Sequence, residues 1–201
     1  MNGLSLWLAL FLVATPPKKE VPSPLASGSP EQSIWRQLLF PEPPPLSAAF
    51  VSPRQAAQWL VQAAKKIKSR IPDLEDRLYF LRHLHYEARR AGLDPDLVLS
   101  VVEVESDFQR YAVSTAGARG YMQVMPFWTN LMGRPQDNLF ETQTNLRYGC
   151  TILAYYLEIE HQNLPRALAR YNGSLGRDVY PNAVLARLRQ HWQGTQEVAS
   201  R

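Results

Sequence analysis

The chain has few cysteines, few long apolar runs and little excess of charge of one sign, and each of these features would have indicated a broad class of protein. One cysteine, Cys150, stands among its 201 residues, so an internal disulfide is excluded. Because Cys150 lies in an apolar helical stretch, we expect it in the core. The four histidines have no acidic or sulfur partners at ligand spacing. The sequence therefore predicts no metal site, and nothing in it indicates a cofactor.

Long apolar runs are also scarce. Leu4–Ala14 is about eleven residues long, which is short of the ~20 needed to span a membrane but typical of a signal-peptide core. We interpret residues 1–15 as a signal peptide or an N-terminal anchor. No Lys or Arg precedes the run, and Leu12–Ala14 is a modest cleavage site, so both alternatives stay open. Either one predicts a periplasmic or cell-envelope protein, with a possible membrane tether at the N-terminus.

Apart from a basic cluster at Lys65, Lys66, Lys68 and Arg70, which is typical of a solvated helix end, charge of one sign is not concentrated along the chain. The formal net charge is +4 and the isoelectric point is about 9.3. The other positive residues are scattered, and no basic run with interleaved aromatic residues occurs, so nucleic acid is not an expected partner. Proline, by contrast, is concentrated: ten of the 16 prolines lie between Thr15 and Pro53. Residues 16–51 are therefore expected to be a Pro-rich linker. Its apolar island, Ile34–Phe40, could dock on the domain or contact a cell-envelope protein partner.

The rest of the chain is dominated by helical periodicity. Ser52 and Pro53 have the residue types that begin a helix, and Gly92 the type that ends one. Between Phe108 and Pro126 the period is lost, and glycines occur instead. We expect a mainly α single domain over residues 52–194, with a small irregular or β-like insertion and a short tail, 195–201. The expected helices are 53 to about 70, 73–91, 94–107, 126–132, 142–160, 165–171 and 181–192.

The helical period of the 94–107 segment places two of its carboxylates, Glu103 and Glu105, on different faces of the expected helix. Glu105 continues the apolar row of Val98, Val101 and Val102, at i, i+3, i+4 and i+7. Glu103 falls on the polar row and is expected to be a solvated surface charge. Burial disfavours the charged form of an acid, so we expect a raised pKa for Glu105, as a general acid needs. The alternative is that Glu105 pairs with a cation from a neighbouring helix.

Four ordered blocks help to decide between these alternatives. They are Glu105-Ser106, then Ala112–Pro126 with its Gly120-Tyr121-Met122-Gln123, then Asn145 with Gly149, and finally Ala169–Gly173. Over residues 94–180 they resemble the soluble lytic murein transglycosylase family, whose SLT domain has a lysozyme-like fold. The family's usual Gly-Leu-Met-Gln and Ala-Tyr-Asn-Ala-Gly differ here at Tyr121, at Arg170 and after Asn172. Neither difference removes a polar functional group.

The resemblance implies a role for each matched position. Glu105 corresponds to the single catalytic acid/base, and Tyr171 to a tyrosine whose hydroxyl approaches that carboxyl. The positions implied to contact the sugar or shape its pocket are Ser114, Gln123, Met125, Tyr171 and Asn172. The substrate would be the peptidoglycan glycan strand, cleaved without water between N-acetylmuramic acid and N-acetylglucosamine to leave a 1,6-anhydro end.

Two alternative functions stay open. The same fold could use water, as a lysozyme-type hydrolase does, with Asp137, Glu141 or Asp178 positioning that water. A non-catalytic wall-binding assembly factor could instead hold the glycan in the same groove. The intact Glu105, Gln123 and Tyr171 favour an enzyme over a binding protein.

Overall fold

The computed structural model describes residues 53–192 of the chain. Within them the regular structure is helical, and the remainder is turns and two isolated β-bridges. The helices are α2 (Pro53–Lys66), α3 (Leu74–Arg90), α4 (Pro95–Ser106), α5 (Phe127–Met132), α6 (Thr142–Ile159), α7 (Leu164–Tyr171), α8 (Val179–Arg187) and the π-helical turn η3 (Leu188–Trp192).

Side chains at the helix starts explain why these segments begin where they do. The carboxylates of Asp73 and Asp94 accept hydrogen bonds from Asp76 N and Asp96 N at the starts of α3 and α4. Pro95 takes the first position of α4, where its missing N–H costs nothing. Gly92 follows α3 with a φ of 71°, a conformation that glycine adopts without strain. The predicted boundaries of α3 and α4 are confirmed to within a residue or two.

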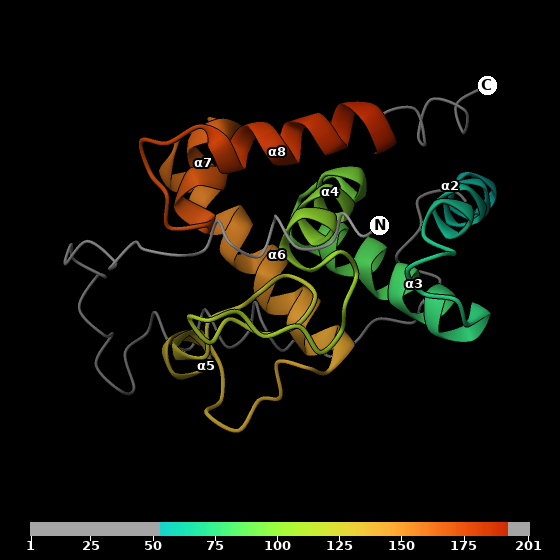
Figure 1. Cartoon of the computed structure of the whole chain (residues 1–201), viewed down its shortest axis with the longest axis horizontal. Helices are drawn as coiled ribbons and strands as arrows, with labels where there is room; N and C mark the ends of the chain where they lie inside the picture. Colours follow the sequence, from blue (N-terminus) through green and yellow to red (C-terminus); the bar gives the residue numbers. More distant parts are fainter. Residues whose placement is uncertain (1–52, 193–201) are drawn as a thin grey trace, which may run out of the picture.

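The helices surround α4. Figure 1 shows α8 lying across one side of α4 and α6 running diagonally below α4 in the view, with α2 and α7 at opposite ends of the molecule. Helix α4 packs against α3, α8 and η3, while α6 packs against α3 and α7. The mainly α fold with one irregular insertion is confirmed. No helix among residues 53–192 is long and apolar enough to cross a membrane.

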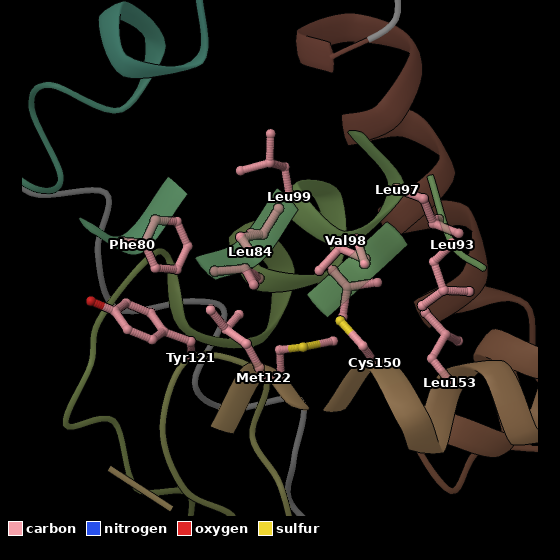
Figure 2. Close-up of a cluster of buried hydrophobic side chains, with 14 of the residues drawn as sticks. Phe80, Leu84, Leu93, Leu97, Val98, Leu99, Tyr121, Met122, Cys150 and Leu153 are labelled. Carbon is pink, nitrogen blue, oxygen red and sulfur yellow. The ribbon is translucent and has the colours of Figure 1, made fainter. Parts of the chain in front are cut away.

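The core joins α3, α4 and α6 to the insertion. Met122 of the insertion and Cys150 of α6 are fully buried, and Figure 2 shows them beside Leu84 and Val98. A side chain at Gly149 would clash with Met122, so the absence of a Cβ there lets the insertion approach α6 closely. The prediction that Cys150 is a core residue is confirmed.

The insertion, residues 108–126, is held to α6 by a buried amide. Asn145 Oδ1 accepts from Met122 N at 2.8 Å, and Asn145 Nδ2 donates to Arg119 O and Leu139 O, each at 2.8 Å. Arg119 also forms the two β-bridges, with Val113 and Val124, that justify the term β-like. Gly120 has a φ of 75°, and a Cβ there would clash with Asn145. Asn145 thus fixes the loop that carries Met122 and Gln123.

One sequence-based expectation about α4 is wrong. Glu103 lies on a polar row with Asp96 and Ser100, and the polar row predicts a solvated side chain. In the structure Asp96 is 4% and Ser100 0% exposed, and the Glu103 side chain is 6% exposed. The reason is tertiary: α2 covers Asp96 through Trp59 Nε1, which donates to Asp96 Oδ1 at 2.8 Å, while η3 covers Glu103. Burial raises the pKa of Asp96 to about 6, against the opposing effect of the Trp59 hydrogen bond.

Other predictions fall on residues outside the described range. These are the signal peptide or anchor at 1–15, the linker at 16–51 with its Ile34–Phe40 island, the start of the domain at Ser52, its end at 193–194, and the tail at 195–201.

Candidate active site

Glu105 lies in the last turn of α4, where two contacts fix the backbone. Ser106 Oγ donates to Tyr121 O at 2.8 Å, which ties the end of the helix to the insertion. Asp107 then ends α4 in the left-handed conformation, with a φ of 46°, and its carboxylate pairs with Arg70 at 3.1 Å. The next residue, Phe108, is buried in the core. In the Glu-Ser pair, Glu105 is therefore the acid, and the Ser106 hydroxyl binds the end of α4 to the insertion.

The Glu105 carboxyl is half-buried and hydrogen-bonded by a phenol. Tyr180, the second residue of α8, has its hydroxyl 2.6 Å from Glu105 Oε1, to which it donates. Burial raises the pKa of Glu105 to about 8, although the Tyr180 hydrogen bond lowers it. A carboxyl with this pKa carries a proton at neutral pH. The raised pKa expected from the apolar row is thus found, and Glu105 meets a hydroxyl rather than the cation of the ion-pair alternative.

A second tyrosine lies close by. Burial and the charge of Glu105 raise the pKa of Tyr171 well above its usual value. Its hydroxyl, however, donates to Met122 O at 2.7 Å. Tyr171 therefore links the end of α7 to the insertion, and the tyrosine that bonds the Glu105 carboxyl is Tyr180.

The remaining candidate residues support the loops around Glu105. Ser114 Oγ accepts from Ala118 N at 3.1 Å within a tight turn. Gln123 has a φ of 47°, and its Nε2 donates to Gly120 O at 3.0 Å and Ala112 O at 3.2 Å. Both side chains are half-buried, and both hold the insertion in shape.

Met125 and Asn172 occupy helix boundaries. Met125 is half-buried immediately before α5, and its carbonyl accepts from Trp128 N at 3.1 Å. Asn172 is the half-buried residue that ends α7. Of the residues singled out in the sequence, Tyr171 bonds the Met122 carbonyl, and the charge of Glu105 acts on the Tyr171 hydroxyl. The described contacts record no direct bond from Ser114, Gln123, Met125 or Asn172 to Glu105.

The carboxylates considered for positioning water have other partners or surroundings. Asp137 accepts from the Tyr148 hydroxyl at 2.7 Å and pairs with Arg134 at 3.1 Å. Glu141 is the N-cap of α6 and accepts from Thr144 N at 3.0 Å. Asp178 is exposed at the start of α8. Asp137 and Glu141 therefore serve the fold. Within residues 53–192, no group of three or more His, Cys, Asp or Glu side chains is arranged to hold a metal ion.

Sequence reasoning missed Tyr180. Its body is buried, at 8% exposed, and its hydroxyl belongs to a site built 75 residues earlier in the chain. Local periodicity contains no signal for such a contact. The one hint in the sequence is a tyrosine directly before Pro181, at the end of the region that resembles the family.

The fold and the site define a lysozyme-like helical domain with one protonatable acid at the end of its central helix. Residues 83–182 match the Transglycosylase SLT domain family, so this part of the chain is an SLT domain.

Curated relatives carry consistent names. The chain is 56% identical over 39 residues to a "Membrane-bound lytic murein transglycosylase C" of Actinobacillus pleuropneumoniae serotype 5b (strain L20), covering 19% of this chain and 11% of the relative. Proteins of the same name are 34% identical over 83 residues in Mannheimia succiniciproducens and 33% over 105 residues in Salmonella paratyphi B. Those matches cover 37% and 44% of this chain, and 23% and 29% of the relatives. The chain thus spans less than a third of the length of these relatives.

Proposed function

We propose that this protein is a peptidoglycan lytic transglycosylase, with Glu105 as its single general acid and base. The observation that carries the proposal is the half-buried Glu105 carboxyl, whose pKa is raised to about 8 and which a tyrosine hydroxyl holds in place. The SLT domain and the names of the relatives supply the substrate class. An acid that keeps its proton at neutral pH suits donation to a glycosidic oxygen.

In the first step, Glu105 donates its proton to the oxygen that links N-acetylmuramic acid to N-acetylglucosamine. The acetamido carbonyl of the muramic sugar stabilises the anomeric carbon as the bond breaks, so no second protein carboxylate is required. The carboxylate left on Glu105 accepts the Tyr180 hydrogen bond, which is stronger to the anion than to the acid. Tyr180 therefore stabilises the form of Glu105 that the first step produces.

In the second step, the Glu105 carboxylate takes the proton of the muramic C6 hydroxyl. That oxygen attacks the anomeric carbon of the same sugar, which yields the 1,6-anhydro end and returns Glu105 to its protonated form. An intramolecular hydroxyl held in place has a high effective concentration compared with water. In this mechanism Ser114, Gln123, Met125, Tyr171 and Asn172 shape the site that holds the sugar, and peptidoglycan is the partner of the domain.

The decisive experiment identifies the products. Purified sacculi are digested with the protein, and the released muropeptides are analysed by mass spectrometry. We expect anhydro-muramic ends, each lighter by one water than a reducing end. Reducing muramic ends would instead assign a lysozyme-type hydrolase. Binding to sacculi without any release would assign the wall-binding factor.

The cellular location is part of the same proposal. Peptidoglycan lies in the cell envelope, and the relatives are named as membrane-bound. We infer a periplasmic or envelope location reached through residues 1–15, with membrane attachment if that segment is retained. Fractionation of cells expressing the full chain, followed by N-terminal sequencing of the mature protein, tests both points.

A further inference from the structure

Glu103 binds the far end of the helix that carries Tyr180. Its Oε1 lies 2.8 Å from His191 Nδ1 and 3.6 Å from Arg187 Nε, and its Oε2 accepts from Trp192 Nε1 at 2.9 Å. With its side chain 6% exposed, Glu103 is closed off by these three partners. We call Glu103, Arg187, His191 and Trp192 the Glu103 clamp.

The clamp and the Glu105 site are both formed by α4 and by the segment α8–η3. Helix α8 continues without a break into η3, so residues 179–192 form one helical rod. Near its start Tyr180 donates to Glu105, and near its end the clamp residues bind Glu103. Glu103 and Glu105 are two residues apart on α4, which turns their side chains about 200° from each other. The rod is therefore fixed to α4 at two points, one of them the acid itself, and Figure 1 shows it lying across that helix.

Helix α2 supports the clamp from outside. Lys66 Nζ donates to His191 O at 2.5 Å and lies 5.3 Å from the centre of the Trp192 ring. Lys66, Arg187, His191 and Trp192 all lie outside residues 83–182, the segment that matches the family. Three of the four clamp residues thus follow the segment that matches the family, and they bind Glu103 within that segment.

We propose that Glu103 is a positioning residue: by holding the end of the α8–η3 rod against α4, its carboxylate keeps the Tyr180 hydroxyl at the Glu105 carboxyl. If the clamp is broken, the rod gains freedom and the hydrogen bond at its other end weakens. Glu103 itself touches no reacting atom. The proposal rests on the proposed function only in that it gives the Tyr180–Glu105 contact a catalytic purpose.

Different charged and titratable groups face the carboxylates of Glu103 and Glu105. Glu103 faces Arg187 of α8 and His191 of η3, with Lys66 of α2 beyond Trp192. Glu105 faces Tyr180 of α8 and Tyr171 of α7. Because the Tyr180 hydrogen bond lowers the pKa of Glu105, a weakened bond raises that pKa above about 8. The direction of the shift therefore reports on the clamp.

The test measures the pKa of Glu105 directly, by NMR titration of the protein labelled with ¹³C at the glutamate carboxyls, with Glu105→Gln to assign the signal. Tyr180→Phe should raise this pKa by about one unit, the equivalent of one hydrogen bond to a charged group. Glu103→Ala should raise it in the same direction by roughly half as much. Glu103→Gln, whose amide oxygen can still accept from Trp192, should raise it less. Glu158→Ala, an equal change of charge at an exposed position of α6, should not move it.

The double variant separates positioning from general destabilisation. In a Tyr180→Phe background, Glu103→Ala should add no further shift, because the contact it acts through is already gone. If Glu103→Ala does not fold, His191→Ala removes an exposed partner of the Glu103 carboxylate and should give the same pattern with a smaller shift. An unchanged pKa of Glu105 in the folded clamp variants, or shifts that add in the double variant, would overturn the proposal.

This readout does not depend on activity. Absence of anhydro products from the wild type would reject the proposed function while leaving the positioning test valid. Conversely, normal products together with an unmoved pKa would reject the clamp alone.

Discussion

Glu103 and Glu105 are the same residue type on the same helix, two positions apart, but their carboxylates have different partners. Glu103 meets the guanidinium of Arg187, the imidazole of His191 and the indole N–H of Trp192. Glu105 meets the Tyr180 hydroxyl in a partly buried position, and its pKa rises to about 8. One carboxylate is paired for structure and the other keeps a proton. The surroundings contributed by the rest of the fold therefore decide which acid can do chemistry.

The largest effect should separate the two acids by activity. Glu105→Gln removes the proton donor and should lower the rate of wall lysis by about 100- to 10,000-fold, the usual contribution of general acid–base catalysis. Glu103→Gln makes the same chemical change two residues away and should cost at most about tenfold. Release of soluble muropeptides from labelled sacculi gives both rates, with Glu158→Gln as a surface control. Full lysis by Glu105→Gln would mean that another residue is the acid.

The second-largest effect should come from removing the Tyr180 hydroxyl, which bonds Glu105. Tyr180→Phe should slow lysis by about tenfold, because a hydrogen bond to a charged group is worth about 1.5 kcal/mol. It should also move the alkaline limb of the pH–rate profile upward from about pH 8, since the lost bond had lowered the pKa of Glu105.

Tyr171→Phe is the matched control for Tyr180→Phe. The Tyr171 hydroxyl donates to Met122 O and makes no hydrogen bond to the acid among the described contacts, so its loss should leave the alkaline limb in place. If Tyr171→Phe moved that limb and Tyr180→Phe did not, the two tyrosines would have to exchange roles.

Sequence patterns predicted the parts of this comparison that are local. Capping residues such as Asp73 and Asp94 mark helix starts by bonding within the next turn, so the boundaries of α3 and α4 could be read from the sequence. The apolar row that includes Val101 placed Glu105 on the packed side of α4. Local signals suffice wherever the partner lies within one or two helical turns.

Contacts between distant segments could not be predicted in this way. The polar row of Glu103 predicts a solvated side chain, but the residues that cover Glu103 follow 84 or more positions later. The Tyr180–Glu105 contact could not be predicted either, because its two residues are 75 positions apart. Periodicity reports which face of a helix is apolar, and it carries no information about which other helix will cover the polar face.

The pH dependence of folding should also distinguish the acids. The pKa of Glu105 is raised from 4.5 to about 8 on folding, so the native state binds more protons than the unfolded state between these values. Its contribution to stability is therefore complete below about pH 4.5 and is lost as the pH rises through about 8. Urea unfolding across this range should show a smaller decline in the free energy of unfolding for Glu105→Gln than for the wild type. Identical slopes would contradict the raised pKa.

The smallest effect tests the outer layer of the Glu103 side. Lys66→Ala removes an exposed ammonium that bonds His191 O and covers the Trp192 ring, while Glu103 keeps all three of its own partners. Exposed contacts of this kind contribute little, so the free energy of unfolding should fall by less than about 1 kcal/mol. Lys65→Ala, one position earlier in α2, should cost still less. A loss above about 2 kcal/mol for Lys66→Ala alone would show that α2, rather than the carboxylate of Glu103, is what holds the rod against α4.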